Sequence, residues 1–95
     1  MRVVFSTEVW EEVSESENYY EEEVEGLGVA FRVAIKESIE EIKKFPNASR
    51  KIYGPFQRYL TQRFPFGIIF RVEGEIIYIV AVAHLKRRPF YWKNR

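Results

Sequence analysis

The longest run of apolar residues in the chain covers eight consecutive positions, from Ile76 to Ala83. Its length and its content of Ile and Val favour a strand that is buried on both faces, and the run is far too short to span a bilayer. A second strand is predicted from Phe66 to Glu73, and the Glu73-Gly74 pair between the two strands predicts a tight hairpin. A hydrophobic hairpin is therefore expected at the centre of the fold.

Two amphipathic helices are predicted in the first half of the chain. Ser6 or Thr7 is a suitable N-cap for the first helix, which carries apolar residues at helical spacing as far as about Glu23. Gly26 is a typical residue for the end of such a helix, and a second helix with one apolar face follows over residues 27–45. Because the connection is short, the two helices are expected to form an antiparallel hairpin.

The remaining segments complete the predicted order. Arg2–Phe5 is predicted as a short strand, Asn47–Pro55 as a polar loop and Phe56–Arg63 as a further strand. The order is therefore β-α-α-β-β-β in a single domain over residues 1–95. We expect an α+β fold in which a small antiparallel β-sheet carries the N-terminal helical hairpin on one face.

The register of the last hairpin decides which side chains face the helices. With a two-residue loop, Phe70 pairs with Ile77, which gathers aliphatic residues on one face and places Tyr78 and His84 on the other. A three-residue loop with Gly74 in a bulge would shift the register and reverse this assignment for the last strand. We adopt the first register, so His84 is predicted on the face that points away from the helices.

Composition narrows the possible classes of protein. A chain of 95 residues with 46% apolar residues and 17% aromatic residues can form one folded domain and is not typical of disorder. It has no cysteine, which excludes disulfides and thiolate sites, and its single histidine excludes a His-rich metal cluster. The start of the chain lacks the long apolar segment of a signal peptide, so a cytoplasmic setting is expected.

Charge is distributed unequally along the chain. Residues 1–49 carry twelve glutamates against five lysines and arginines, whereas residues 50–95 carry ten lysines and arginines against two glutamates. Such asymmetry is typical of a protein that offers a basic surface to an anionic partner, although it also serves solubility.

The strongest candidate site follows the last strand. No metal-ligand spacing, phosphate-binding glycine loop or Ser/His/Asp arrangement occurs, so no metal and no cofactor are expected. The candidate catalytic residues are His84, Arg87, Arg88 and Tyr91. The candidate contacts to nucleic acid or another target are Arg58, Arg63, Arg71, Lys86, Arg87, Arg88 and Trp92.

Two interpretations of this cluster remain open. Arginines beside aromatic residues suit phosphate contact and base stacking, and a metal-free ribonuclease could use an arginine for charge and a His or Tyr to move the proton. The alternative is structural: His84 is a hydrogen-bonded residue at a strand end, and residues 89–92 pack over the edge of the sheet.

Several segments resemble a known family. They are YYEE at 19–22, GLG at 26–28, F…I…FP within 31–46, QRFPFGIIFRVEG at 62–74 and AVAHLKRRPFYW at 81–92. Their order is similar to that of the RelE/ParE toxin superfamily, and most similar to its ParE and plasmid-stabilisation branch. The resemblance implies the toxin of a type II toxin–antitoxin system, neutralised by a cognate antitoxin. It also implies the fold predicted above, which mRNA interferases of this superfamily share.

The resemblance implies different activities for different branches. RelE-like members cut mRNA on the ribosome with basic residues and a C-terminal tyrosine, whereas ParE-like members inhibit DNA gyrase. Matching Tyr91 to that tyrosine places Leu85 and Gly67 where two catalytic arginines are expected. The resemblance therefore favours a gyrase inhibitor without catalytic activity of its own. The alternatives are an RNA-cleaving toxin with a rearranged site, and an inactive relative that only binds an antitoxin.

Overall fold

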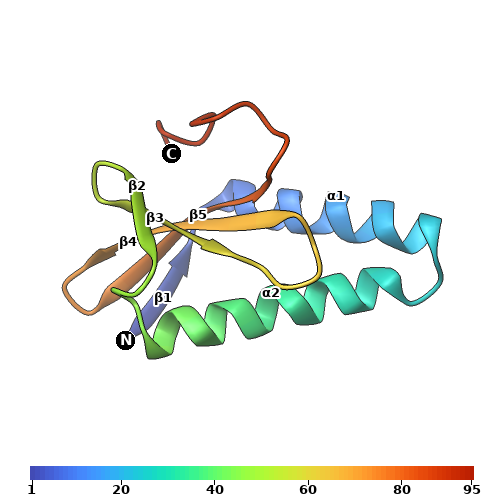
Figure 1. Ribbon diagram of the computed structural model, residues 1–95, viewed down its shortest axis with the longest axis horizontal. Helices are drawn as coiled ribbons and strands as arrows, with labels where there is room; N and C mark the ends of the chain where they lie inside the picture. The colour runs from blue at the N-terminus through green and yellow to red at the C-terminus, as the bar shows by residue number, and fades with distance from the viewer.

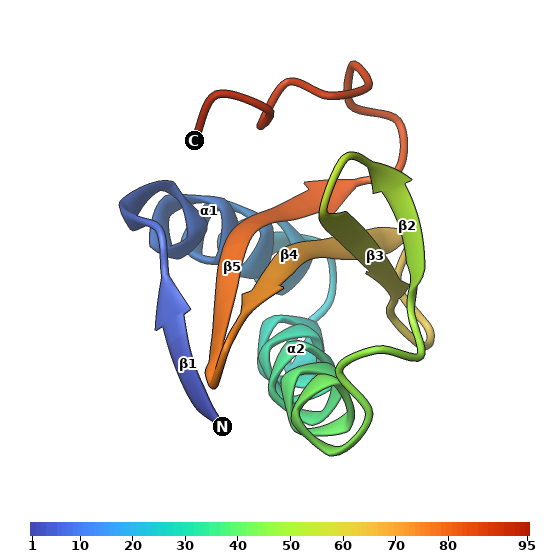
Figure 2. The ribbon, with the colours of Figure 1, turned by 90° about the vertical axis from the view of Figure 1, so that its left-hand side faces the viewer.

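The computed structural model describes all residues, 1–95, and contains two helices and five strands. In chain order they are β1 (Arg2–Phe5), α1 (Thr7–Glu23), α2 (Leu27–Lys44), β2 (Arg50–Tyr53), β3 (Phe56–Leu60), β4 (Phe66–Glu73) and β5 (Ile76–His84). The strands form one sheet in the order β1-β5-β4-β3-β2, with both helices against one side and residues 85–95 crossing the other (Figures 1 and 2). Neither helix combines the length and the apolar character that a membrane span requires.

The predicted α+β fold with a helical hairpin on the sheet is confirmed, with three differences in the strands, of which the simplest is that β3 ends at Leu60 rather than at Arg63. β1 pairs with β5 in parallel, so the sheet is mixed rather than wholly antiparallel. The segment predicted as a polar loop contains β2, which pairs antiparallel with β3. β2 lies at the edge of the sheet and only its Ile52 is partly buried, so it has no hydrophobic pattern by which the sequence could have indicated it.

The helical hairpin depends on close contact at its turn. Gly26 adopts a φ of 85°, which favours glycine, and the Glu21 carboxylate accepts the N–H groups of Gly26 and Gly28 at 2.8 and 2.9 Å. A Cβ atom at Gly28 would lie 2.7 Å from the carbonyl oxygen of Glu17. The Gly-Leu-Gly segment is therefore required both for the turn and for the close approach of α2 to α1.

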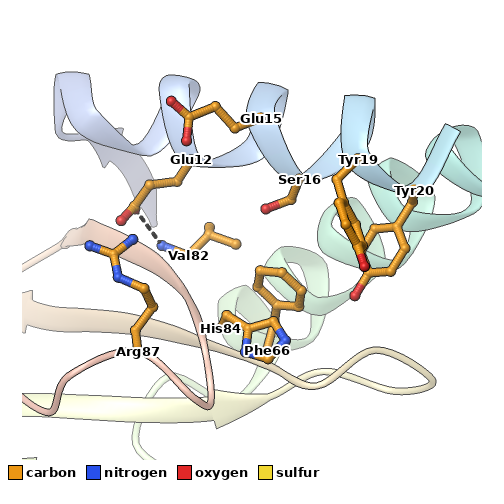
Figure 3. A pocket seen from close by; sticks show the side chains of 9 residues that line it. All are labelled: Glu12, Glu15, Ser16, Tyr19, Tyr20, Phe66, Val82, His84 and Arg87. Carbon is orange, nitrogen blue, oxygen red and sulfur yellow. Dashed lines mark hydrogen bonds between the residues drawn. The ribbon is translucent and has the colours of Figure 1, made fainter. Parts of the chain in front are cut away.

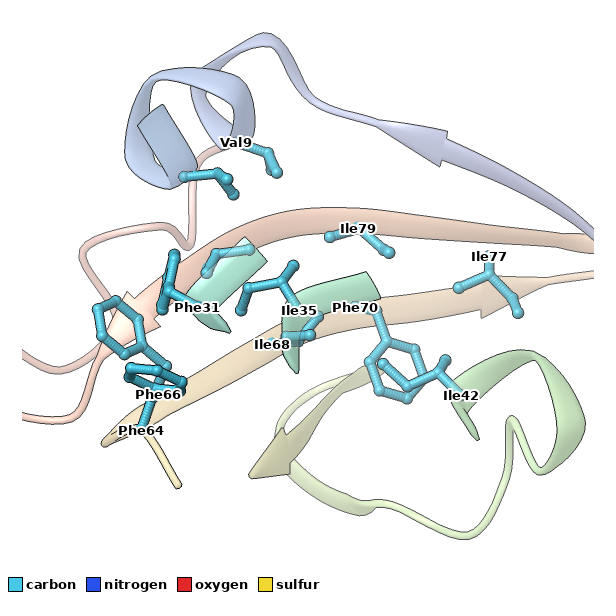
Figure 4. Packing of buried hydrophobic residues seen from close by; sticks show 12 residues of the cluster. Val9, Phe31, Ile35, Ile42, Phe64, Phe66, Ile68, Phe70, Ile77 and Ile79 are labelled. Atoms are coloured by element: carbon cyan, nitrogen blue, oxygen red, sulfur yellow. The ribbon is translucent and has the colours of Figure 1, made fainter. Parts of the chain in front are cut away.

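The principal core lies between the helices and one face of the sheet (Figure 4). Its buried members are Val9, Val13, Phe31, Ile35, Ile42, Phe64, Phe66, Ile68, Phe70, Ile77, Ile79 and Val82. Phe31 of α2 contacts the rings of Phe66 and Phe64, with centroids 4.8 and 5.3 Å apart. This core confirms the predicted apolar faces of β4 and of the first half of β5.

The loop of the last hairpin differs by one residue from the predicted one. Glu73 pairs with Ile76, so the two-residue loop is Gly74-Glu75, with Gly74 at a φ of 57°. Phe70 consequently pairs with Ile79 rather than with Ile77. A shift of two residues in the register leaves each side chain on its predicted face, since side chains alternate along a strand.

A β-bulge in β5 then reverses the faces of the last residues of the strand. Phe70 pairs with Ile79, whereas the neighbouring Ile69 pairs with Ala81, so Val80 is an extra residue. His84, beyond the bulge, lies on the helix side with its ring 5.1 Å from that of Phe66. The prediction that His84 points away from the helices is therefore wrong.

Tyr78 precedes the bulge and keeps its predicted place. It pairs with Arg71, whose guanidinium group lies 4.4 Å from the centroid of the Tyr78 ring on the face away from the helices. In the predicted register Ala81 and Ala83 share the helix-side face of Ile77 and Ile79, but they lie instead in a second core on the opposite face.

This second core is closed by residues 85–95. Its buried members are Phe56, Ile69, Val80, Ala81, Ala83 and Trp92. Trp92 is 3% exposed, and its ring centroid lies 5.0 Å from that of Phe56. The sheet is thus covered on both faces, which agrees with the unbroken apolar run of β5.

Candidate target-binding site

A basic groove of about 410 Å³ opens between the 85–95 segment, the end of β5 and the strands β2 and β3. None of the side chains that line it is acidic. Its cationic residues are Arg50, Lys51, Arg58, Arg87 and Arg88. We call these five residues and the space between them the basic groove.

The cations of the basic groove have no acidic partners within the protein. All ion pairs of the molecule involve other cations, such as Arg71 with Glu73 and Arg95 with Glu12. Arg50 and Arg58 lie directly opposite each other on β2 and β3. Like charges in this position repel each other, so an anion in the groove would relieve the repulsion as well as gain contacts.

Arg58 occupies the space above Gly67 in the floor of the groove. A Cβ atom at Gly67 would lie 2.9 Å from both Cγ and Cδ of Arg58, and 3.7 Å from Leu85. Gly67, one of the two positions that lack the arginines expected of an RNA-cleaving member, therefore adjoins the stem of an arginine from another strand, and Leu85, the other position, lies beside Gly67. The absence of a side chain at Gly67 is what makes room for Arg58.

Tyr91 is held by contacts on its ring and its hydroxyl. The Arg87 guanidinium lies 3.9 Å from the ring centroid, and the phenol O–H donates a hydrogen bond to the Glu12 carboxylate. Burial, followed by this hydrogen bond, raises the pKa of Tyr91 well above its usual value near 10. The phenol therefore retains its proton at neutral pH and is a poor proton donor for catalysis.

His84 lies at the end of β5, where it borders both the basic groove and a second pocket of about 330 Å³ on the side of α1 (Figure 3). In that pocket it adjoins Phe66 and faces the α1 residues Ser16 and Tyr19 (Figure 3). Its Nδ1 accepts the N–H of Lys86 at 3.0 Å. His84 is thus a hydrogen-bonded residue at a strand end, as the structural alternative proposed.

The other predicted contact residues are dispersed. Arg63, at a φ of 71°, lies over the Phe64 ring and lines a pocket against α2. Arg71 lies nearer the hairpin end of β4, and Lys86 is exposed outside the basic groove. Trp92 borders the basic groove but is 3% exposed and packs against Phe56, and its role as a contact residue stays a prediction. Of the predicted contacts, Arg58, Arg87, Arg88 and Trp92 are brought together around the basic groove.

Two groove residues were not predicted. Arg50 and Lys51 fall in the segment interpreted as a loop, and nothing in their local sequence indicates that β2 brings them beside Arg58. No group of three or more His, Cys, Asp or Glu side chains is placed so that it could hold a metal ion.

Comparison with known proteins reveals a similar fold. No family model and no curated protein sequence matches the chain. Among solved structures, the chain is similar to one from the "Chromosomal ParDE TA system from P. aeruginosa", with a TM-score of 0.67 and 17% sequence identity. The similarity covers 90% of this chain and 97% of that chain. At this level of identity the two chains are shown to share their fold.

Proposed function

We propose that the protein is the toxin of a type II toxin–antitoxin system, that it inhibits DNA gyrase by binding through the basic groove, and that a cognate antitoxin neutralises it. The observation that carries the proposal is the concentration of five unpaired cations in one groove. The fold shared with a chain of a ParDE toxin–antitoxin system supports the same class. Gyrase as the target places the action of the protein in the cytoplasm.

Binding is favoured over RNA cleavage by the state of the groups that could move a proton. The Tyr91 hydroxyl donates to Glu12 and the His84 Nδ1 accepts from Lys86, which leaves the His84 Nε2 as the one nitrogen or oxygen atom of this pair without a partner. Loss of one group that stabilises charge at a reacting phosphate typically lowers the rate by about 10²–10³-fold. Binding to an acidic protein surface or to DNA phosphates requires only complementary charge, which the basic groove supplies.

A second surface supports the antitoxin as a partner. An apolar groove of about 400 Å³ lies between β1, α1 and α2, and Trp10, 52% exposed, is part of its wall. Arg32, Lys36, Glu40 and Lys43 line the same groove; Arg32 pairs with Glu17 and Lys43 with Glu40, so Lys36 is the cation there without an acidic partner. An amphipathic helix with acidic residues beside its apolar face would match both features.

The proposal is tested by adding the purified protein separately to DNA gyrase and to translating ribosomes. We expect supercoiling to be inhibited and the mRNA to remain intact, and we expect the double variant Arg87→Ala/Arg88→Ala to lose inhibition. Lys93→Ala is the matched control, because Lys93 is an exposed cation of the same segment outside the basic groove.

Two results would replace the proposal by an alternative. Codon-specific cuts in the mRNA, lost on Tyr91→Phe or His84→Ala, together with unimpaired supercoiling, would identify a ribonuclease. Absence of both activities in a protein that still binds its antitoxin would identify an inactive relative.

A further inference from the structure

We propose that Glu12, on α1, is a positioning residue for the basic groove: its carboxylate holds the 85–95 segment where Arg87 and Arg88 line the groove. The functional part of this inference rests on the proposed role of the groove as the target contact. The positioning part depends only on the contacts of Glu12 and is tested separately.

The Glu12 carboxylate joins three parts of the chain. It accepts the N–H of Val82 at 3.0 Å and the O–H of Tyr91, and it forms an ion pair with Arg95 at 3.0 Å. The side chains of Glu12 and Arg95 are only 11% and 17% exposed. Charge-assisted hydrogen bonds shielded from water are stronger than neutral ones, so one carboxylate holds both Tyr91 and Arg95 in place.

Glu12 lies at the edge of β5 where β1 no longer pairs with it. β1 pairs with β5 only as far as Ile79, so the edge of β5 beyond that residue lacks a neighbouring strand. The N–H of Val82 is satisfied by Glu12, while the carbonyl oxygen of Val80 accepts the Ser6 hydroxyl at 3.1 Å and the Arg95 guanidinium at 3.0 Å. Side chains thus satisfy the backbone groups that a strand would otherwise pair.

The contacts continue from Glu12 to the groove. Tyr91 is hydrogen-bonded to Glu12, and the Arg87 guanidinium packs over the Tyr91 ring. The adjacent Trp92 is buried against Phe56. The wall of the groove formed by residues 87–92 is therefore fixed at Tyr91 on one side and at Trp92 on the other. Without the carboxylate, Tyr91 and Arg95 lose their shared partner and the wall is no longer fixed at Tyr91.

The chain offers a matched control for a merely structural role. Ser6→Ala removes another side-chain contact to the same edge of β5, the hydrogen bond to Val80, and Ser6 forms no hydrogen bond to the 85–95 segment. A variant that only weakens the edge of β5 should behave like Ser6→Ala. A variant that releases the segment should also change the surroundings of Trp92.

Trp92 supplies the readout, because the other tryptophan, Trp10, is exposed and can be replaced. In Trp10→Phe protein we expect Trp92 to be shielded from the neutral quencher acrylamide. Glu12→Ala should increase the quenching constant several-fold, whereas Ser6→Ala should leave it unchanged. Glu12→Gln should fall between them, since an amide oxygen can accept from Val82 but cannot form the ion pair with Arg95. Circular dichroism at the same temperature identifies the variants that remain folded. If Glu12→Ala does not fold, the quenching constant of Glu12→Gln is the test.

The inference is overturned if Trp92 stays as shielded in the folded Glu12 variant as in the parent, or if Ser6→Ala exposes it equally. Gyrase inhibition is measured on the same variants, and Glu12→Ala should weaken it about tenfold, the equivalent of about 1.4 kcal/mol. If quenching rises while inhibition is unchanged, the positioning of the segment stands and the proposed use of the basic groove fails. Failure of the positioning role of Glu12 and failure of the proposed use of the basic groove therefore give different results.

Discussion

Arg50 on β2 and Arg58 on β3 lie directly opposite each other in the sheet, and neither has a carboxylate partner. Two like charges in this arrangement destabilise a pair of strands. A feature that lowers stability without a structural gain is typical of a functional surface, where binding takes precedence over stability. The pair therefore indicates that the basic groove is built for an anionic partner.

Replacing Arg50 by Ser should separate stability from function. We expect the free energy of unfolding to rise by about 0.5 kcal/mol, because the repulsion with Arg58 is removed, and we expect gyrase inhibition to weaken. Urea denaturation and a supercoiling assay measure the two quantities. Arg2→Ser, which removes an exposed cation at the far edge of the sheet, is the control. An Arg50→Ser protein that is less stable than the wild type would contradict the repulsion argument.

Replacing Gly28 by Ala should destabilise the helical hairpin. The added Cβ atom would meet the backbone carbonyl oxygen of Glu17 at 2.7 Å, and backbone cannot move aside as a flexible side chain can. A loss of about 1–3 kcal/mol in the free energy of unfolding is expected, the usual range for overpacking. Val29→Ala, at a residue that is 63% exposed, should change stability far less. Equal effects of the two substitutions in thermal denaturation would rule out the close-contact argument.

Tyr91 should make the protein sensitive to alkaline pH. The folded protein retains the phenol proton at pH values above 10, where a tyrosine of the unfolded chain has lost it, since its pKa in the folded state is raised. Unfolding then releases a proton, so the free energy of unfolding falls as the pH rises above 10. Tyr91→Phe should show a shallower decline over this range, measured by urea denaturation at a series of pH values. If the free energy of unfolding falls with pH equally in the wild type and in Tyr91→Phe, Tyr91 does not contribute to the alkaline sensitivity.

Binding of the cognate antitoxin should stabilise the toxin. A partner that binds only the folded state shifts the unfolding equilibrium by mass action, and for a domain of this size a tight complex should raise the melting temperature by several degrees. The emission of Trp10, in the wall of the apolar groove, should change on binding, whereas that of buried Trp92 should not. An unchanged melting temperature with excess antitoxin would count against the proposed partnership.

The sequence by itself determined the main elements of the fold. The helical spacing of residues 7–44, Gly26 between the two helices and the apolar run at 76–83 are local patterns, and each predicts its element without reference to the rest of the chain. Because a helix with one apolar face and a strand buried on both faces must cover one another, the α+β arrangement follows from these elements.

Only the tertiary structure decided which side chains form the site. The extra residue at Val80 places His84 on the helix side, and the unbroken apolar run of β5 gives no local sign of where the extra residue falls. Arg50 reaches Arg58 only because β2 joins the edge of the sheet. Glu12 is one of twelve glutamates in the first 49 residues, and nothing in its neighbourhood along the chain distinguishes it. Its partners Val82, Tyr91 and Arg95 are all at least 70 positions further along the chain. Contacts at such separations are set by the fold and not by local propensity.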